Sequence, residues 1–171
     1  MVIDLYSGEE IFDDPLNSTN SRTRANTNPY DYNCAGYALE TYSWYLPCDS
    51  ETYYNAYNKF ELTGETYFGS RNEFRRNALT VEFTSRILRD FPDVRMISSV
   101  KDLHPDEYAF AFRVGVDDFH FVKRGANGVW YEKRGNIPQF FRMSRERVFN
   151  TSWGSRYNGP IILMAKKRKA A

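Results

Sequence analysis

The chain has 171 residues and a formal net charge of +1, which fits one domain and excludes a strong overall attraction to nucleic acid or to a membrane surface. Thirteen Tyr, thirteen Phe and three Trp make aromatic rings a large part of any core or groove. No run of eighteen apolar residues occurs, so no membrane-spanning helix is predicted.

Residues 1–28 are polar and rich in Asn, Thr, Ser and Arg, and they predict an extended N-terminal arm. They lack the basic segment and apolar run of a signal peptide. From Cys34, apolar and aromatic residues recur at three- and four-residue steps, which predicts a helix that ends at Pro47. The tyrosine-rich stretch at 49–70 has no sustained period and indicates loops with short helical turns.

A second helix is predicted over 72–91, before Pro92. Its predicted apolar face comprises Phe74, Ala78, Val81, Ser85, Leu88 and Phe91. Strands are predicted at 94–98 and at 107–115, where large apolar residues alternate with Ala and Arg.

The segments DFHFVKR and GVWYEKR predict the two arms of a hairpin around GANG. Ser144 is expected to cap a short helix with Glu146 in its first turn. GPIILMAKK, at 159–167, predicts a final buried strand.

Helices followed by strands predict an α+β fold, with N-terminal helices packed on an antiparallel sheet. We place this domain at 29–165, between the N-terminal arm and a basic tail at 166–171. The tail is either a solvated end or a contact for phosphate or another acidic partner. Apart from that contact, we expect no nucleic acid and no membrane among the partners.

Cys34 is predicted in the first turn of its helix, where unpaired backbone N–H groups and the helix dipole favour a thiolate. The same N–H groups can bind an oxyanion. A buried, structural thiol is the alternative, because unpaired cysteine is among the most often buried residue types. With only Cys34 and Cys48 present there is no disulfide framework, and we expect both thiols to be reduced.

A nucleophilic cysteine needs a base, and the chain offers two histidines. His104 precedes Pro105 among charged residues and indicates an exposed loop. His120 lies in the predicted hairpin, where a strand fixes its side chain. His120 is therefore the better candidate for a positioned base.

If residues 124–128 form the hairpin connection, Lys123 pairs with Val129 and His120 lies opposite Glu132. Glu132 can then accept a hydrogen bond from one ring nitrogen and leave the other for the thiol. Without Cys34 this would be an ordinary cross-strand pair, worth up to about 1 kcal/mol. A register shifted by two would place Trp130 or Arg134 opposite His120 instead, on the same face.

Cysteine and histidine are also zinc ligands, and Cys34, Cys48, His104 and His120 could in principle make a four-ligand site. No CxxC or HxxxH spacing occurs, and neither does a Walker loop, GxGxxG or GxSxG. We therefore expect no metal and no cofactor.

The segment NPYDYNCAGYALETY resembles the nucleophile segment of the NlpC-type and CHAP-type cysteine peptidases and amidases, which have a papain-like fold. DDFHFVKRGANGVWYEKRGN resembles the hairpin that carries the histidine and the third polar residue in that superfamily. The chain resembles still more closely a group of uncharacterised bacterial and phage proteins with an NCYAYAL-like start and an HFYR-like hairpin. These resemblances cover residues 28–46 and 107–136.

The resemblance implies a Cys34 nucleophile, a His120 base and a Glu132 orienting residue. Glu132 occupies a position where these relatives commonly have a second histidine. Weaker candidates for the oxyanion site or for substrate contact are Tyr30, Asn33 and Trp130.

The resemblance implies a cysteine hydrolase that cleaves an amide, peptide or isopeptide bond through a thioester, in a cytoplasmic or phage-associated setting. Its substrate would be a protein, a cell-wall peptide or a small amide, and transamidation or deamidation can use the same site. The alternative is an inactive papain-like module that binds partners, for example in phage assembly. The polar arm and the basic tail favour this second possibility.

Overall fold

The computed structural model describes residues 2–3, 10–12, 30–47, 71–115, 118–135, 140–154 and 156–168. Cys48 and the tyrosine-rich stretch at 49–70 lie outside these residues. The described strands are β1 Val2–Ile3, β2 Glu10–Phe12, β3 Val94–Met96, β4 Glu107–Val114, β5 Phe119–Arg124, β6 Trp130–Lys133, β7 Phe140–Met143 and β8 Ile162–Lys167. The helices are α2 Cys34–Ala38, α4 Arg71–Asp90 and α5 Arg145–Asn150, with a 3-10 turn η2 at Val100–Asp102.

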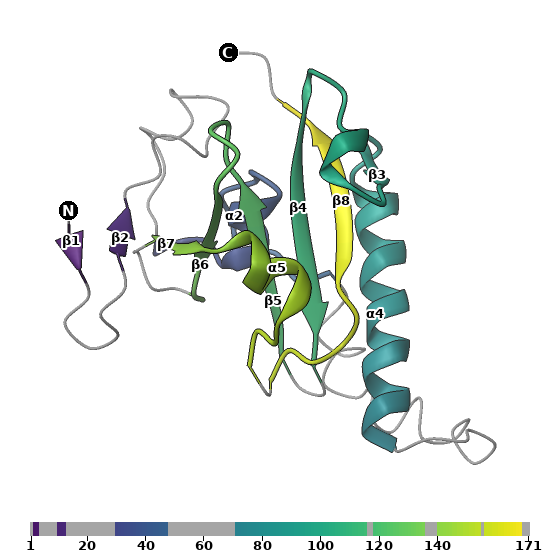
Figure 1. Cartoon of the computed structure of the whole chain (residues 1–171). Helices are drawn as coiled ribbons and strands as arrows, with labels where there is room; N and C mark the ends of the chain where they lie inside the picture. The colour runs from purple at the N-terminus through teal and green to yellow at the C-terminus, as the bar shows by residue number, and fades with distance from the viewer. Residues whose placement is uncertain are drawn as a thin grey trace.

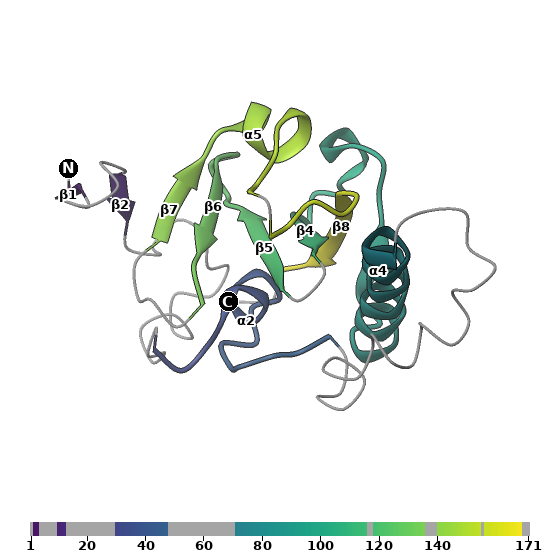
Figure 2. The same ribbon diagram turned by 90° about the horizontal axis from the view of Figure 1, so that it is seen from below.

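The eight strands form one antiparallel sheet in the order β1-β2-β7-β6-β5-β4-β8-β3 (Figure 1). Figure 2 shows α2 and α4 on one side of the sheet and α5 on the other. The α+β class predicted from the sequence is confirmed. None of the helices in the described part of the chain is both long and apolar enough to cross a membrane.

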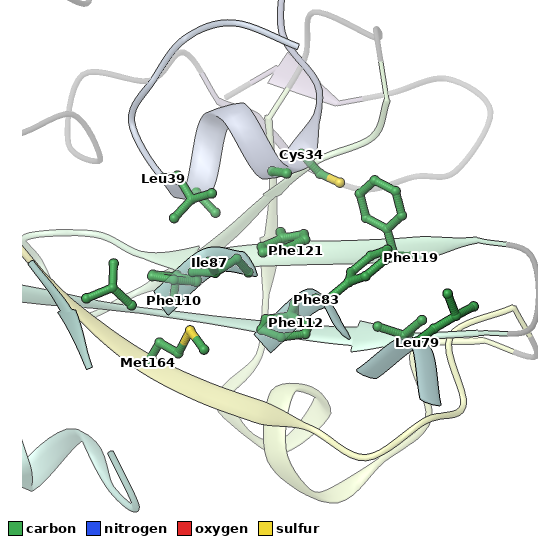
Figure 3. Packing of buried hydrophobic residues seen from close by; sticks show 14 of the residues in the cluster. Cys34, Leu39, Leu79, Phe83, Ile87, Phe110, Phe112, Phe119, Phe121 and Met164 are labelled. Atoms are coloured by element: carbon green, nitrogen blue, oxygen red, sulfur yellow. The ribbon is translucent and has the colours of Figure 1, made fainter. Parts of the chain in front are cut away.

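The main core lies between the sheet and the two helices α2 and α4, and it is rich in phenylalanine (Figure 3). Phe110 and Phe112 of β4 stack on Phe121 of β5, with ring centroids 6.2 Å and 4.9 Å apart. Figure 3 shows Cys34 at the edge of this core, with its sulfur directed toward Phe119. The aromatic residues thus pack α2, which begins at Cys34, onto the sheet.

The predicted apolar face of α4 is wrong in part: Phe91 packs against the core, the side chain of Phe74 lies outside the described residues, and the middle of the face differs. Leu79, Phe83 and Ile87 are the residues buried against the sheet, whereas Val81 is 66% exposed and Leu88 is 37% exposed. The buried residues follow the four-residue spacing of one helix face. Apolar residues lie on two neighbouring faces of α4, and the face with Leu79, Phe83 and Ile87 is the one that packs in the core.

The predicted helix from Cys34 to Pro47 is also too long, because α2 has five residues and ends at the C-cap Leu39. Glu40 and Tyr42 then adopt positive φ angles of 55° and 53°, which no right-handed helix contains. The chain folds back so closely that a β-carbon on Gly36 would overlap the carbonyl oxygen of Ser43. Glycine is therefore required at position 36, two residues after Cys34.

The predicted hairpin exists, but its register differs by two residues. Arg124 pairs with Trp130 and Val122 with Glu132, so the connection is 125–129. The Gly125 amide donates to the Val129 carbonyl at 2.8 Å and closes this loop, which has the predicted length of five residues but begins one residue later. Because a shift of two keeps every side chain on its predicted face, Glu132 still points to the side of the sheet that His120 occupies.

Described residues on both sides of the predicted domain, 29–165, join its sheet. The predicted arm contributes β1 and β2, which pair with each other and with β7 at the edge of the sheet. At the other end, Lys166 belongs to β8 rather than to a tail. Its side chain is buried and its Nζ lies 3.1 Å from the Asp93 carboxylate.

Candidate active site

The sequence-predicted nucleophile and base come from opposite faces of the sheet and meet near the start of β5. Phe119 and Phe121 pack beside Cys34 beneath α2, so the intervening His120 projects to the other face. His120 is the second residue of β5, close to the point where that strand begins. Its ring can therefore reach the thiol at the margin of the sheet.

Cys34, His120 and Glu132 line one cavity of about 600 Å³. All three are buried, with exposed fractions of 4%, 6% and 3%. The remaining lining residues are Asn33, Trp44, Leu46, Asp118, Phe119, Arg134, Gly135, Arg147, Trp153 and Tyr157. The wall is thus part aromatic and part charged, and the three predicted catalytic side chains share it.

Asn33 caps the start of α2, the helix that begins at Cys34. Its Oδ1 accepts from the Gly36 amide at 2.9 Å and from the Tyr45 amide at 3.2 Å. Its Nδ2 donates to the Tyr45 carbonyl at 2.8 Å. The side chain therefore caps α2 and secures the returning loop, which makes Asn33 a support for Cys34.

The His120–Glu132 pair is well formed despite the changed register. Nε2 of His120 lies 2.8 Å from Oε2 of Glu132. The other carboxylate oxygen, Oε1, accepts from Arg134 Nη2 at 2.8 Å and Nε at 3.1 Å. Glu132 is thereby fixed between a histidine and an arginine, and Nδ1 is the ring nitrogen left for the thiol.

Aromatic rings hold the His120 imidazole in place. Tyr157 stacks on it with centroids 5.2 Å apart, and Trp153 meets it edge-on at 6.1 Å. The Tyr157 hydroxyl donates to the Asp118 carboxylate at 3.4 Å. The Trp153 Nε1 donates to the Arg147 carbonyl at 3.0 Å. The His120 ring is thus positioned by packing as well as by the Glu132 carboxylate.

The electrostatics of the pair favour a charged histidine. Burial lowers the pKa of His120, but hydrogen bonds with Cys34 and Glu132 outweigh it and raise that pKa to about 9. For Glu132, burial raises the pKa, yet the hydrogen bond and charge of His120 and the contact with Arg134 bring it down to about 2. At neutral pH the pair is therefore an imidazolium and a carboxylate.

Two weaker candidates lie outside the cavity. Tyr30 is 63% exposed and does not line it. Trp130 is buried on the α5 side, where its ring packs edge-on against Phe149 with centroids 5.6 Å apart. His104 lies on the surface as predicted, with its side chain 64% exposed beside Glu107.

No family model, no curated protein and no solved structure matches this chain. In the described part of the chain, no three His, Cys, Asp or Glu side chains are grouped as a metal site. Hydrogen bonds instead run from the His120 imidazole to the Glu132 carboxylate and on to the Arg134 guanidinium, and Cys34 lines the same cavity.

Arg134, Tyr157 and Lys133 are site residues that the sequence analysis did not assign. Arg134 adjoins the predicted triad in sequence, and its guanidinium also lies 4.0 Å from the centroid of the Phe141 ring. The alternation of β6 would have placed it on the face of Glu132. Tyr157 lies in a loop far along the chain, and no local pattern connects it with His120.

Proposed function

We propose that this protein is a cysteine hydrolase of papain-like fold that cleaves an amide, peptide or isopeptide bond. The observation that carries the proposal is that Cys34 and the hydrogen-bonded pair His120–Glu132 line the wall of one cavity large enough for a ligand. A cysteine at the start of a helix, with histidine and carboxylate on adjacent antiparallel strands, supports the papain-like assignment.

In the acylation step, the Cys34 sulfur attacks the carbonyl carbon of the scissile bond while His120 is protonated. A carbon–sulfur bond forms, and the carbonyl electrons move to oxygen. His120 then donates its proton to the leaving nitrogen, the carbon–nitrogen bond breaks, and an acyl-thioester remains on Cys34. Glu132 keeps the ring oriented and stabilises its positive charge throughout.

In the deacylation step, neutral His120 takes a proton from water, and the resulting hydroxide attacks the thioester carbonyl. The carbon–sulfur bond breaks, the product leaves as a carboxylic acid, and Cys34 returns as a thiolate beside the imidazolium. A different amine in place of water would give transamidation by the same sequence of proton transfers.

The dipole of α2 contributes less to the activation of Cys34 than the sequence predicts. With five residues, α2 sums few peptide dipoles, so its field at Cys34 is small. The positive charge next to the thiol is that of His120, which Glu132 and Arg134 support from behind. We therefore assign the activation of Cys34 mainly to the imidazolium.

The test is turnover of a library of α- and isopeptide-linked peptides, followed by mass spectrometry. Product formation should be lost in Cys34→Ala and His120→Ala and retained in Cys48→Ser. A mass increase on Cys34 that hydroxylamine removes would identify the thioester. Cleavage that survives Cys34→Ala would contradict the proposal, and a folded protein that cleaves nothing would favour a binding module.

A further inference from the structure

Lys133, the residue after Glu132 in β6, has no exposed surface. Its Nζ donates to the Tyr32 carbonyl at 2.5 Å and to the Gly135 carbonyl at 2.6 Å. The same atom lies 4.8 Å from the centroid of the Tyr32 ring. A buried ammonium is costly unless it is hydrogen-bonded, and these contacts compensate that cost.

These two carbonyls belong to the two halves of the site. Tyr32 directly precedes Asn33, the cap of α2, and is two residues before Cys34. Gly135 follows β6 and lines the cavity. Lys133 therefore joins the backbone that leads into the nucleophile to the strand end that holds Glu132, across a sequence separation of 101 residues.

Alternation along β6 explains how one strand reaches both halves. Consecutive side chains point to opposite faces, so Glu132 extends toward His120 while Lys133 extends toward the α2 side. Arg134 returns to the first face and holds the second oxygen of Glu132.

We propose that Lys133 is a positioning residue for Cys34, whose ammonium fixes the Tyr32 carbonyl against the end of β6 and so sets the thiol relative to His120. This inference rests on the proposed role of Cys34 as the nucleophile. Under this proposal, residues 132–134 together fix the relative positions of His120 and Cys34.

The electrostatics agree with this geometry. Burial lowers the pKa of Lys133 to about 8, and the negative charge of Cys34 opposes the shift. The lysine and the thiol are therefore coupled: a charge on Cys34 favours the ammonium that holds the Tyr32 carbonyl.

The experiment compares Lys133→Met with Lys123→Met in the full chain. Lys123 is a matched control because it is also a fully buried lysine beneath α2, but its Nζ contacts Glu40 at 3.3 Å and the Tyr37 ring at 4.2 Å. Three quantities are measured for each protein: the melting temperature, the rate of Cys34 alkylation by iodoacetamide at pH 7, and kcat/KM on any substrate found.

Both variants should melt at a lower temperature. Only in Lys133→Met should iodoacetamide also alkylate Cys34 at least about 10-fold more slowly than in the wild type. The same variant should show a kcat/KM about 100-fold lower, through a lower kcat, as expected for a displaced reacting group. Equal alkylation rates in Lys133→Met, Lys123→Met and the wild type would overturn the positioning role. An unreactive Cys34 in the wild type would instead refute the proposed function itself.

A measurement on the wild type decides the matter if Lys133→Met does not fold. In protein labelled at lysine Cε, the NMR signal of Lys133 should titrate near pH 8. Carbamidomethylation of Cys34 removes its charge and should move this midpoint to lower pH. An unchanged midpoint would show that the lysine and the thiol are not coupled and would overturn the inference.

Discussion

At the scale of one residue, Glu132 helps to keep the His120 ring charged. Its hydrogen bond and charge help to raise the pKa of His120 to about 9, so kcat/KM should fall on the alkaline side near that pH as the imidazolium is lost. In Glu132→Gln this support disappears, and the alkaline limb should move to lower pH.

The pH profile of kcat/KM measures this effect, because it reports the ionisations of the free enzyme. Glu73→Gln is the matched control, since Glu73 is an exposed carboxylate in α4 far along the chain from the site. An alkaline limb at the same pH in Glu132→Gln and in the wild type would show that Glu132 does not set the charge of His120.

Trp44 is predicted to contact the substrate. It lines the cavity although 55% of its surface is exposed, which leaves an aromatic face available beside Cys34. Trp44→Ala should raise KM by about 5- to 10-fold, for a contact of about 1 kcal/mol, with little change in kcat. Steady-state kinetics check this prediction.

Tyr30→Ala is the control for Trp44→Ala, because Tyr30 is 63% exposed and does not line the cavity. Its kinetic constants should stay close to those of the wild type. A large loss of kcat in Tyr30→Ala would support the oxyanion role that the family resemblance implies, and it would contradict the placement of this residue outside the site.

At the scale of elements, the short α2 depends on the loop that folds back over it. Gly36→Ala would place a β-carbon into the Ser43 backbone, which cannot withdraw as a flexible side chain can. We expect a loss of about 3 kcal/mol or more in the free energy of unfolding. Urea denaturation measures it.

Gly128→Ala separates this steric effect from ordinary loss of glycine. Gly128 has a φ of +80°, but an added β-carbon would meet only the end of the Arg124 side chain. Its cost should be about 1–2 kcal/mol, from backbone conformation alone. Equal losses in the two variants would argue against the close approach of Ser43 to α2.

The same elements show what the sequence can and cannot predict. The hairpin was predicted with the wrong register, yet Glu132 still reaches His120 because strand alternation preserves the face under a shift of two. The length of α2 was not predictable from periodicity, because its end is decided by distant partners. Asn33 holds Tyr45 across 12 residues, and Glu40 reaches Lys123 across 83.

The burial of Lys133 could not be predicted from the sequence either. A lysine in a strand normally indicates a solvated position, and nothing in WYEKR distinguishes this one. Its burial follows from the Tyr32 carbonyl 101 residues away, which only the folded chain brings close. Local pattern therefore predicted the candidate reacting groups, whereas the groups that position them required the tertiary structure.

At the scale of the whole molecule, the raised pKa of His120 links stability to pH. The pKa increases from 6.5 to about 9 on folding, so the folded state holds its proton more tightly. The associated stability is fully present below pH 6.5 and is lost as pH rises through about 9. A shift of this size corresponds to at most about 3 kcal/mol at 1.36 kcal/mol per pKa unit.

The measurement is the difference in unfolding free energy between the wild type and His120→Gln at a series of pH values. The difference should shrink between about pH 6.5 and 9. Taking a difference removes the opposite contribution of Lys133, whose lowered pKa makes stability rise with pH above about 8. A difference that stays constant or grows over this range would contradict a buried imidazolium.

The most direct test of the central claim is the rate of alkylation of Cys34 and Cys48 by iodoacetamide, followed at each cysteine by mass spectrometry from pH 5 to 9. Pairing with the His120 imidazolium should make Cys34 react quickly well below pH 8, while Cys48 reacts more slowly. In His120→Ala this difference in alkylation rate should disappear. Two thiols that are equally unreactive at every pH below 8, or a fast Cys34 unaffected by His120→Ala, would contradict the account.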